Sequence, residues 1–335
     1  MTVRVGVNGF GRIGRLAIRA IFENNRNDIE LVAVNDWKDL NTAAHLIKYD
    51  SAHGRMGGQV EIKEDGIDFG RGTVKALSNR NPAELPWGDL GVDIVLECTG
   101  KFNTKDGAIQ HLDGGAKRVL CSAPCKGADS TIVYGVNNAA LLADHTVVSA
   151  ASCTTNCLAP VADVLHQAVG IESGFCTTIH AYTGDQNTVD TRHKDLRRAR
   201  AAAVSLIPTK TGAAAAVGQV LPELDGKLDG SAVRVPTVNV SLVDLAFTSS
   251  RATSAEELNA ALKAASLGSH KGVLAYCDEP LVSIDHNHSL ESSVVDSLET
   301  KVLNDNFCRV LSWYDNEWAF ANRMLDLAVL MGKQG

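Results

Sequence analysis

The chain has 335 residues, more than one ordinary hydrophobic core organises, so two domains are expected. Its 45% hydrophobic and 21% charged residues are typical of a globular protein, and its formal net charge of −7 argues against a nucleic-acid or membrane surface. No apolar run reaches the roughly 18 residues of a membrane span. The first residues lack a secretory-signal pattern, so the expected location is the cytoplasm.

The N-terminal part predicts a βαβ unit. Residues 3–8 (VRVGVN) predict a buried strand, residues 9–24 an amphipathic helix after a glycine turn, and residues 29–36 (IELVAVND) a second buried strand. Further strands ending in small residues are expected at 92–100, 117–124 and 145–153. This alternation predicts a doubly wound parallel sheet of the Rossmann type, in a domain covering residues 1–150.

The glycine turn carries a dinucleotide-binding pattern. Gly9, Gly11 and Gly14 match G-x-G-x-x-G between a predicted strand and helix, and Asp36 ends the second strand. Gly9 would make the tight turn, Gly11 would let the backbone approach a pyrophosphate, and Gly14 would let helix and strand pack closely. Asp36 would accept hydrogen bonds from a ribose diol and repel a 2′-phosphate, which favours NAD over NADP.

The second half predicts an α+β domain at residues 151–316, built on a mixed or antiparallel sheet. A helix is expected at 154–170, and long strands are expected at 174–186, 231–250 and 304–317.

Two later helices complete the expected elements. Residues 254–266 form one of them, with Ser254 and Glu257 as a capping-box pair. The last helix, at about 317–333, is expected to pack back on the first domain.

The segment SAASCTTNCLAP (149–160) contains two cysteines that the pattern assigns different roles. Cys153 lies where a strand meets a helix, so the helix dipole and nearby N–H groups should lower its pKa. Cys157 lies one turn further and should be buried and inert. His180, which ends a predicted strand, is the candidate base for Cys153.

The remaining cysteines and the basic segment point to a function less specifically. No pair of the eight cysteines has C-x-x-C spacing and no Cys/His cluster has zinc spacing, so no metal site is predicted. The basic segment RHKDLRRAR (192–200) is either a solvated loop or an anion site.

Segments from the first predicted strand to the last predicted helix carry a family resemblance: GVNGFGRIGR, AVND, SCTTNCLAP, HAYTGDQ, HKDLRRARAA, TGAAAAVG, RVPTVNVSLVDL and SWYDNEW. In these segments the chain resembles the phosphorylating glyceraldehyde-3-phosphate dehydrogenases. The resemblance implies a homotetrameric, NAD-dependent enzyme that converts D-glyceraldehyde 3-phosphate and inorganic phosphate to 1,3-bisphosphoglycerate. It also implies that Cys153 forms a thioester with the substrate and that His180 accepts the thiol proton.

The same resemblance implies two anion sites and further cofactor contacts. Thr183 and Arg234 would hold the substrate phosphate, and the attacking phosphate would contact Ser152, Thr154, Arg198, Thr211 and Gly212. Hydroxyls, a backbone N–H and arginine forks are the groups that a tetrahedral anion requires. Cofactor contacts are implied for Arg12, Ile13, Arg80, Thr99, Ser122 and Asn316, with Asn316 at the nicotinamide amide.

The chain departs from the family pattern at four positions. Ala150 and Ala215 stand where asparagine and lysine are common, and neither change removes a catalytic group. Thr191 and Arg192 replace the Leu-Pro pair common in members that prefer NAD. Arg192 could pair with a 2′-phosphate and give secondary use of NADP, or it could face solvent.

Two alternatives stay open at this point. A related erythrose-4-phosphate dehydrogenase would use water in place of phosphate, although the intact TKTGAA segment argues against it. A binding or regulatory protein would have kept the fold and lost turnover, although Cys153, His180, Arg234 and Asn316 are all present.

Overall fold

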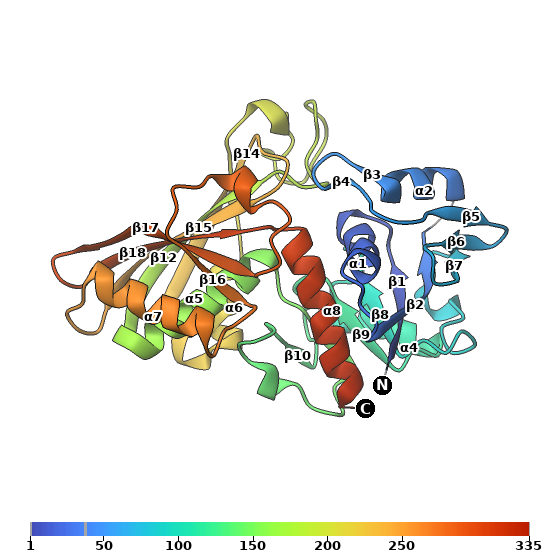
Figure 1. Cartoon of the computed structure of the whole chain (residues 1–335), viewed down its shortest axis with the longest axis horizontal. Coiled ribbons are helices and arrows are strands. Elements are labelled where there is room, and N and C mark those ends of the chain that lie inside the picture. The colour runs from blue at the N-terminus through green and yellow to red at the C-terminus, as the bar shows by residue number, and fades with distance from the viewer. Residues whose placement is uncertain (1, 37–38, 335) are drawn as a thin grey trace. The chain divides into compact units, whose positions relative to one another are not determined.

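The computed structural model describes residues 2–36 and 39–334, which form two compact units. One unit holds the described residues of Met1–Tyr134, Asn138–Ser152 and Phe320–Gly335; the other holds Gly135–Asn137 and Cys153–Ala319. Each unit has its own sheet (Figure 1). The predicted fold class, a Rossmann-type parallel sheet with an α+β part on a mixed sheet, is confirmed. In the described ranges, no helix is long and apolar enough to cross a membrane.

The sheet of the first unit has nine strands in the part of the chain that the structure describes, in the order β10-β11-β9-β8-β1-β2-β7-β6-β5. Pairing is parallel from β10 to β7 and antiparallel at the edge formed by β6 and β5. The strand bounds are β1 Val3–Asn8, β2 Ile29–Asn35, β5 Glu61–Lys63, β6 Gly66–Asp68, β7 Thr73–Leu77, β8 Ile94–Glu97, β9 Arg118–Cys121, β10 Ser130–Thr131 and β11 Val147–Ser149. Because β1 lies between β2 and β8, the strand order reverses there, which is where such sheets bind ligands.

The helices of the first unit come from both ends of the chain. They are α1 (Arg12–Glu23), α2 (Leu40–Lys48), α3 (Lys105–Ala108), α4 (Gln110–Asp113) and most of α8 (Trp318–Lys333). The unit also contains 3-10 turns at Pro82–Glu84 and Asn138–Ala140, and a small hairpin of β3 (Tyr49–Asp50) and β4 (Gly54–Arg55). Asn24 donates to Asn322 over 2.7 Å, and Arg26 pairs with Asp326 at 2.8 Å. The last helix is therefore joined to the segment that follows α1.

The second unit is built on a seven-stranded mixed sheet among the described residues, in the order β13-β14-β12-β15-β18-β17-β16. β12 pairs in parallel with β14 and antiparallel with β15. The strands are β12 Ile171–Ala181, β13 Ile207–Lys210, β14 Leu228–Val235, β15 Ser241–Ser249, β16 Leu274–Cys277, β17 Ser293–Leu303 and β18 Phe307–Tyr314. The helices α5 (Cys153–Val169), α6 (Ala213–Val220) and α7 (Ala255–Leu267) pack against the sheet (Figure 1), with 3-10 turns at Ala202–Val204, Pro222–Leu224 and Ser283–His286.

The predicted capping box of α7 forms only in half. The Ser254 hydroxyl accepts from the Glu257 amide at 3.3 Å, as expected. The Glu257 carboxylate instead accepts from Arg251 at 2.5 Å and from Thr253 at 2.8 Å. A guanidinium forms a charge-assisted bond with a carboxylate, which is stronger than a bond from a neutral backbone N–H.

Candidate active site

A pocket of about 400 Å³ lies at the carboxyl ends of β1, β2 and β8 in the first unit. Of the predicted cofactor residues, Gly9, Gly11, Asp36, Arg80 and Thr99 line it. The remaining lining residues are Asn8, Asn35, Asn79, Pro82, Leu85, Cys98, Lys101 and Phe102. Arg12, Ile13, Gly14 and Ser122 lie outside this lining, and Asn316 belongs to the other unit.

Close backbone contacts require glycine at Gly9 and Gly14. Gly9 has φ +103°, and a Cβ there would lie 2.7 Å from the Thr99 nitrogen. A Cβ on Gly14 would lie 2.0 Å from the Gly9 carbonyl oxygen. Gly11 is the N-cap of α1, so the helix begins shortly after the end of β1, and the positive end of its dipole favours an anion there.

Two charged residues near this glycine turn, Asp36 and Arg12, differ in their contacts. Asp36 is exposed, has φ +90°, and donates its backbone N–H to the Leu77 carbonyl at 3.1 Å. Arg12 forms a two-point ion pair with Asp50, one contact being 3.1 Å. Burial alone would raise the pKa of Asp50, but Arg12 and the backbone N–H groups of His53 and Ala52 together hold it well below its usual range. No sequence pattern pointed to Asp50, which lies in the short β3 strand.

The predicted catalytic pair is brought together in the second unit. Cys153 is the first residue of α5, and His180 is the next-to-last residue of β12. The Cys153 Sγ lies 3.5 Å from the His180 Nε2, and the other ring nitrogen, Nδ1, lies 2.7 Å from the Ala181 carbonyl oxygen. His180 is only 4% exposed, so its ring is oriented by protein atoms.

The pKa values of this pair differ from what the helix position alone suggests. The expectation of a lowered Cys153 pKa is wrong: burial raises it, and this outweighs the opposing effects of the Arg234 charge and nearby N–H groups. Burial, assisted by Arg234, lowers the pKa of His180 to about 3. At neutral pH the ligand-free pair is therefore a thiol facing a neutral imidazole. Cys157 is buried, as expected, and burial raises its pKa to about 12.

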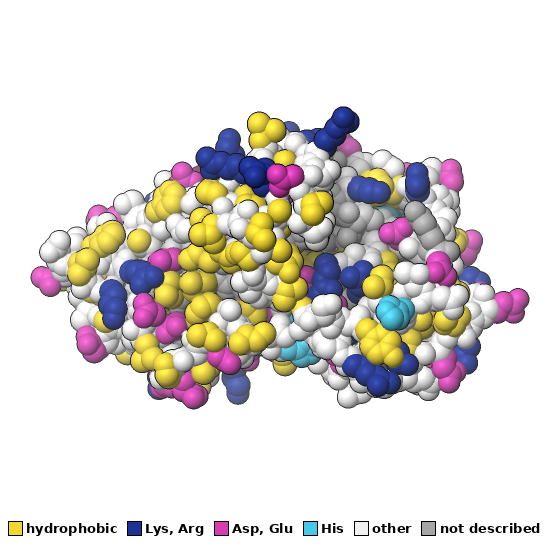
Figure 2. Space-filling view, turned by 90° about the horizontal axis from the view of Figure 1, so that it is seen from above, with side chains coloured by type: hydrophobic (Ala, Val, Ile, Leu, Met, Phe, Trp, Pro, Cys, Tyr) yellow, Lys and Arg dark blue, Asp and Glu magenta, His cyan; other side chains and the backbone are white. Residues whose placement is uncertain are grey.

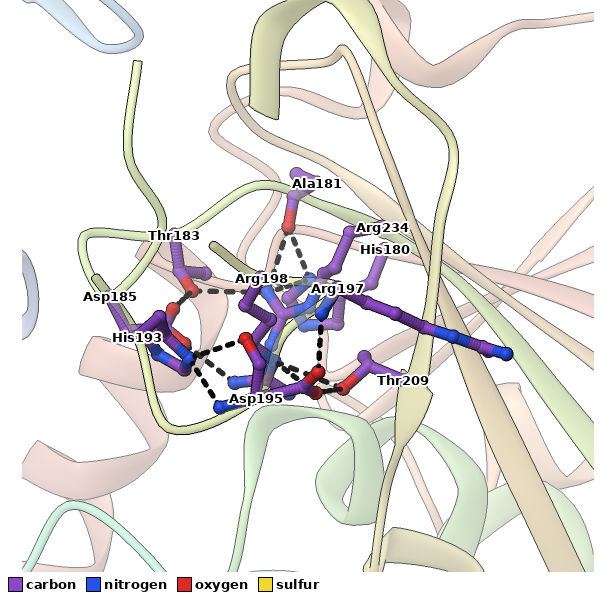
Figure 3. A network of polar contacts seen from close by, with 10 residues as sticks. All are labelled: His180, Ala181, Thr183, Asp185, His193, Asp195, Arg197, Arg198, Thr209 and Arg234. Carbon is purple, nitrogen blue, oxygen red and sulfur yellow. Dashed lines mark hydrogen bonds and ion pairs between the residues drawn. The ribbon is translucent and has the colours of Figure 1, made fainter. Parts of the chain in front are cut away.

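Arg234 joins His180 to a second polar group (Figure 3). Its Nη1 lies 3.0 Å from the His180 Nδ1 and donates to the Ala181 carbonyl at 3.0 Å and to the Thr183 hydroxyl at 3.1 Å. The Thr183 hydroxyl donates to Asp185, which also accepts from Arg198 at 2.5 Å. The predicted anion-binding residues Thr183, Arg198 and Arg234 thus form one network, with Asp185 as a member that the sequence did not reveal.

A basic depression of about 1140 Å³ adjoins Arg198. Arg198 donates to Thr209 at 3.0 Å, and Thr209 donates to Asp195 at 2.9 Å. Thr211 lines the same depression and accepts from the Ala213 N–H at 3.2 Å, while Gly212 is the N-cap of α6. The segment 192–200 therefore supplies cationic side chains to a concave surface.

Tyr314, in β18, is a buried member of the site that sequence reasoning missed. Its hydroxyl lies 2.8 Å from the Thr154 hydroxyl and 2.9 Å from the Thr178 hydroxyl, and its ring packs edge-on against His180. Thr154 is buried, and Ser152 lies half-buried just before α5.

Asn316 is held by a hydrogen-bond chain that ends at Ala181, the residue after the candidate base His180. The Ala181 N–H donates to the Ser241 hydroxyl at 3.1 Å, and that hydroxyl donates to the Asn316 Oδ1 at 2.7 Å. One orientation of the Asn316 amide is thereby fixed.

Family models match both parts of the chain. Residues 3–105 match the glyceraldehyde 3-phosphate dehydrogenase NAD binding domain, and residues 152–316 match the glyceraldehyde 3-phosphate dehydrogenase C-terminal domain. The chain belongs to the glyceraldehyde-3-phosphate dehydrogenase family. It is 62% identical to the glyceraldehyde-3-phosphate dehydrogenase of Xanthobacter flavus over the whole of both chains. It is also 62% identical to that of Cereibacter sphaeroides, over 99% of each chain, and 53% identical to that of Geobacillus stearothermophilus, over the whole of both.

Proposed function

We propose that this chain oxidises D-glyceraldehyde 3-phosphate with NAD and couples the oxidation to inorganic phosphate, giving 1,3-bisphosphoglycerate and NADH through a thioester on Cys153. The observation that carries the proposal is the Cys153 Sγ at 3.5 Å from a neutral, buried His180 whose ring adjoins Arg234. The relatives from Xanthobacter flavus and Cereibacter sphaeroides, which are named for this activity, align with 100% and 99% of this chain.

The first chemical step uses the neutral pair directly. As the Cys153 sulfur forms a bond to the aldehyde carbon, its proton passes to the His180 Nε2. The Cys153 backbone N–H and the protonated His180 then stabilise the new oxyanion. His180 can accept this proton because burial and Arg234 keep it unprotonated at neutral pH.

The residues of the first unit fit a bound NAD. The pocket at the ends of β1, β2 and β8 offers glycine backbone, the start of α1 and the Asp36 carboxylate, which suit a pyrophosphate and a ribose diol. Bound NAD supplies the hydride acceptor for the oxidation. We assign the nicotinamide amide to Asn316, whose side chain Ser241 holds in one orientation.

The two anion sites follow from the network around Arg234. We assign the substrate phosphate to Thr183 and Arg234, and the attacking phosphate to Ser152, Thr154, Arg198, Thr211 and Gly212. Support comes from the hydrogen-bonded chain that links Arg234, Thr183, Asp185 and Arg198, since it holds both guanidinium groups in a single cluster.

The decisive experiment measures NADH formation from glyceraldehyde 3-phosphate with and without inorganic phosphate. Turnover is expected to depend strongly on phosphate, because phosphate resolves the thioester. Equal rates without phosphate would mean that water resolves it. Erythrose 4-phosphate, tested as substrate in parallel, should be the poorer one.

We also propose that the enzyme uses NADP as a second, less preferred cofactor. Arg192 is exposed in the loop after β12. The family resemblance implies that this loop reaches the adenosine ribose of a neighbouring subunit, where the Arg192 charge would offset the repulsion between Asp36 and a 2′-phosphate. Replacing Arg192 with alanine is expected to lower the NADP-to-NAD ratio of kcat/KM several-fold. Arg200→Ala is the matched control, because Arg200 lies in the same loop and pairs with Asp190. An unchanged ratio in Arg192→Ala would refute the role.

We also propose a cytoplasmic homotetramer. The loop between β12 and β13 carries the exposed apolar side chains of Val189, Leu196, Val204 and Leu206. Figure 2 shows hydrophobic side chains gathered on the second unit. Exposed apolar side chains concentrated in one loop favour contact with another protein surface, and a further copy of the chain is the proposed occupant.

A further inference from the structure

A buried polar network lies beneath the pocket of the first unit. Its deepest members are Glu97, at the end of β8, His111, in α4, and Trp87, in the loop before β8. Their exposed fractions are 2%, 0% and 0%. None of the three lines the pocket, so none would be expected to touch a bound dinucleotide. A buried carboxylate in such a place requires hydrogen-bond partners, since an uncompensated charge there would be costly.

Trp87 determines the tautomer of His111. The indole Nε1–H can only donate, and it lies 3.0 Å from the His111 Nδ1, which must therefore be unprotonated. The His111 proton then resides on Nε2, which lies 3.0 Å from a Glu97 oxygen and donates to it. The ring is thus a neutral donor toward the carboxylate. Its edge also packs against Phe102, which lines the pocket.

Glu97 accepts hydrogen bonds from four groups. One oxygen takes the Thr99 backbone N–H at 2.8 Å and the Thr99 hydroxyl. The other takes the His111 Nε2–H and the Asn8 amide at 2.5 Å. All four partners are donors, which only an acceptor-only group such as a carboxylate satisfies. Thr99 and Asn8 both line the pocket.

The network continues from Asn8 along the edge of the pocket. Because the Asn8 nitrogen donates to Glu97, its oxygen faces Asn35 and accepts from the Asn35 amide at 2.7 Å. The Asn35 side chain forms two hydrogen bonds with the Asn79 backbone: its Nδ2 donates to the Asn79 carbonyl at 2.8 Å, and its Oδ1 accepts from the Asn79 N–H at 2.9 Å. Each amide therefore has a single orientation. The residues that follow Asn35 and Asn79 in sequence are Asp36 and Arg80, which lie on the pocket lining.

We propose that Glu97 is a positioning residue for dinucleotide affinity, acting with His111 and Trp87 to fix the directions of the hydrogen bonds that hold Thr99, Asn8, Asn35 and Asn79 in the pocket wall. This inference rests on the proposed NAD-dependent function. It assigns a role to three side chains that do not contact the cofactor. Dinucleotide affinity depends on these three side chains because pocket residues that are already ordered lose less conformational entropy when the ligand binds.

The test is Glu97→Gln, measured by calorimetric titration with NAD and with ADP-ribose, which lacks the nicotinamide. The glutamine NH2 group would face donors only, so the Kd for both ligands is expected to rise about tenfold or more. The KM for glyceraldehyde 3-phosphate at saturating NAD should stay unchanged, because Thr183 and Arg234, which are assigned to the substrate phosphate, belong to the second unit.

Val95→Ala is the matched control. Val95 is a fully buried residue of the same strand and packs in the same cluster as Trp87, so its truncation lowers the melting temperature without altering any hydrogen-bond donor. Its Kd for NAD should match that of the unmodified enzyme. Equal weakening in both variants would show that loss of stability alone reduces affinity, and would overturn the proposal.

If Glu97→Gln does not fold, the proposal is tested with a second variant, Trp87→Phe. It keeps an aromatic ring and removes the N–H that sets the His111 tautomer together with part of the buried ring volume, for which Val95→Ala serves as the packing control, so a Kd increase of a few-fold beyond that of Val95→Ala is expected. An unchanged Kd in either folded variant overturns the proposal. If the unmodified enzyme itself fails to bind NAD, the proposed function is wrong, and this outcome is distinct from failure of the positioning role.

Discussion

Replacing Cys153 with alanine should reduce NADH formation by about 10⁴-fold or more, because the covalent route through a thioester is lost. The Cys153 Sγ is the sulfur that lies 3.5 Å from the His180 Nε2. With the sulfur removed, the aldehyde has no nucleophile, and the imidazole has no proton to accept. Initial rates at saturating NAD, phosphate and substrate measure the loss, and NAD binding should be unaffected.

Cys157→Ala is the matched control for that variant. Cys157 lies one turn further along α5, is fully buried, and contacts Ser293 and Ser312 in place of His180. Its truncation should cost some stability and leave turnover close to that of the unmodified enzyme. Comparable loss of activity in the two variants would contradict the assignment of Cys153 as nucleophile.

Replacing Arg234 with leucine is expected to lower kcat/KM for glyceraldehyde 3-phosphate by about 10²–10³-fold, which corresponds to about 3–4 kcal/mol of lost charge-assisted hydrogen bonding. The guanidinium contacts His180, Ala181 and Thr183 through a single nitrogen. Leucine would remove the positive charge proposed for the substrate phosphate and the donor that holds the Thr183 hydroxyl. Arg234→Lys should recover only part of the loss, because a lysine does not offer the guanidinium fork.

A second measurement on Arg234→Leu uses the pH dependence of Cys153 alkylation. Burial raises the Cys153 pKa and the Arg234 charge lowers it, so losing Arg234 raises it further. The rate of inactivation by iodoacetamide should therefore climb with pH in the unmodified enzyme, with the profile displaced to higher pH in the variant. Arg309→Leu, which removes a charge paired with Asp244 and Glu299 on the same sheet, controls for loss of charge alone. A shared profile in all three proteins would contradict the role of Arg234.

The parts of the fold that depend on local pattern could be predicted from the sequence. The strand at 3–8, the helix after Gly11 and the strand at 29–36 are observed as β1, α1 and β2, because periodicity and glycine punctuation act over a few residues. The expected long strand region at 231–250 is divided into β14 and β15. Pro236 follows β14, and Val240, with φ +67°, precedes β15, so the chain turns there.

The features that could not be predicted are set by contacts between distant residues. Tyr314 reaches Thr154 and Thr178 across 160 and 136 positions of the chain, and no spacing rule connects them. The same reason explains the Cys153 pKa: the helix start is visible in the sequence, whereas the burial that outweighs it depends on the packing of the folded unit. The ion pair between Arg12 and Asp50 is likewise a tertiary contact.

The return of α8 to the N-terminal unit has a consequence for synthesis on the ribosome. The segment after α1 emerges early, yet its partners Asn322 and Asp326 are translated only after the second unit. A Cβ at Gly332 would lie 2.3 Å from the Val3 side chain, so the final turn of α8 also abuts the beginning of β1. Domains generally fold as units during translation, N-terminal ones first. Here α8 can dock on the nucleotide-binding unit only after the whole of the second unit has been translated, and nascent chains that stall inside the second unit leave the first unit incomplete.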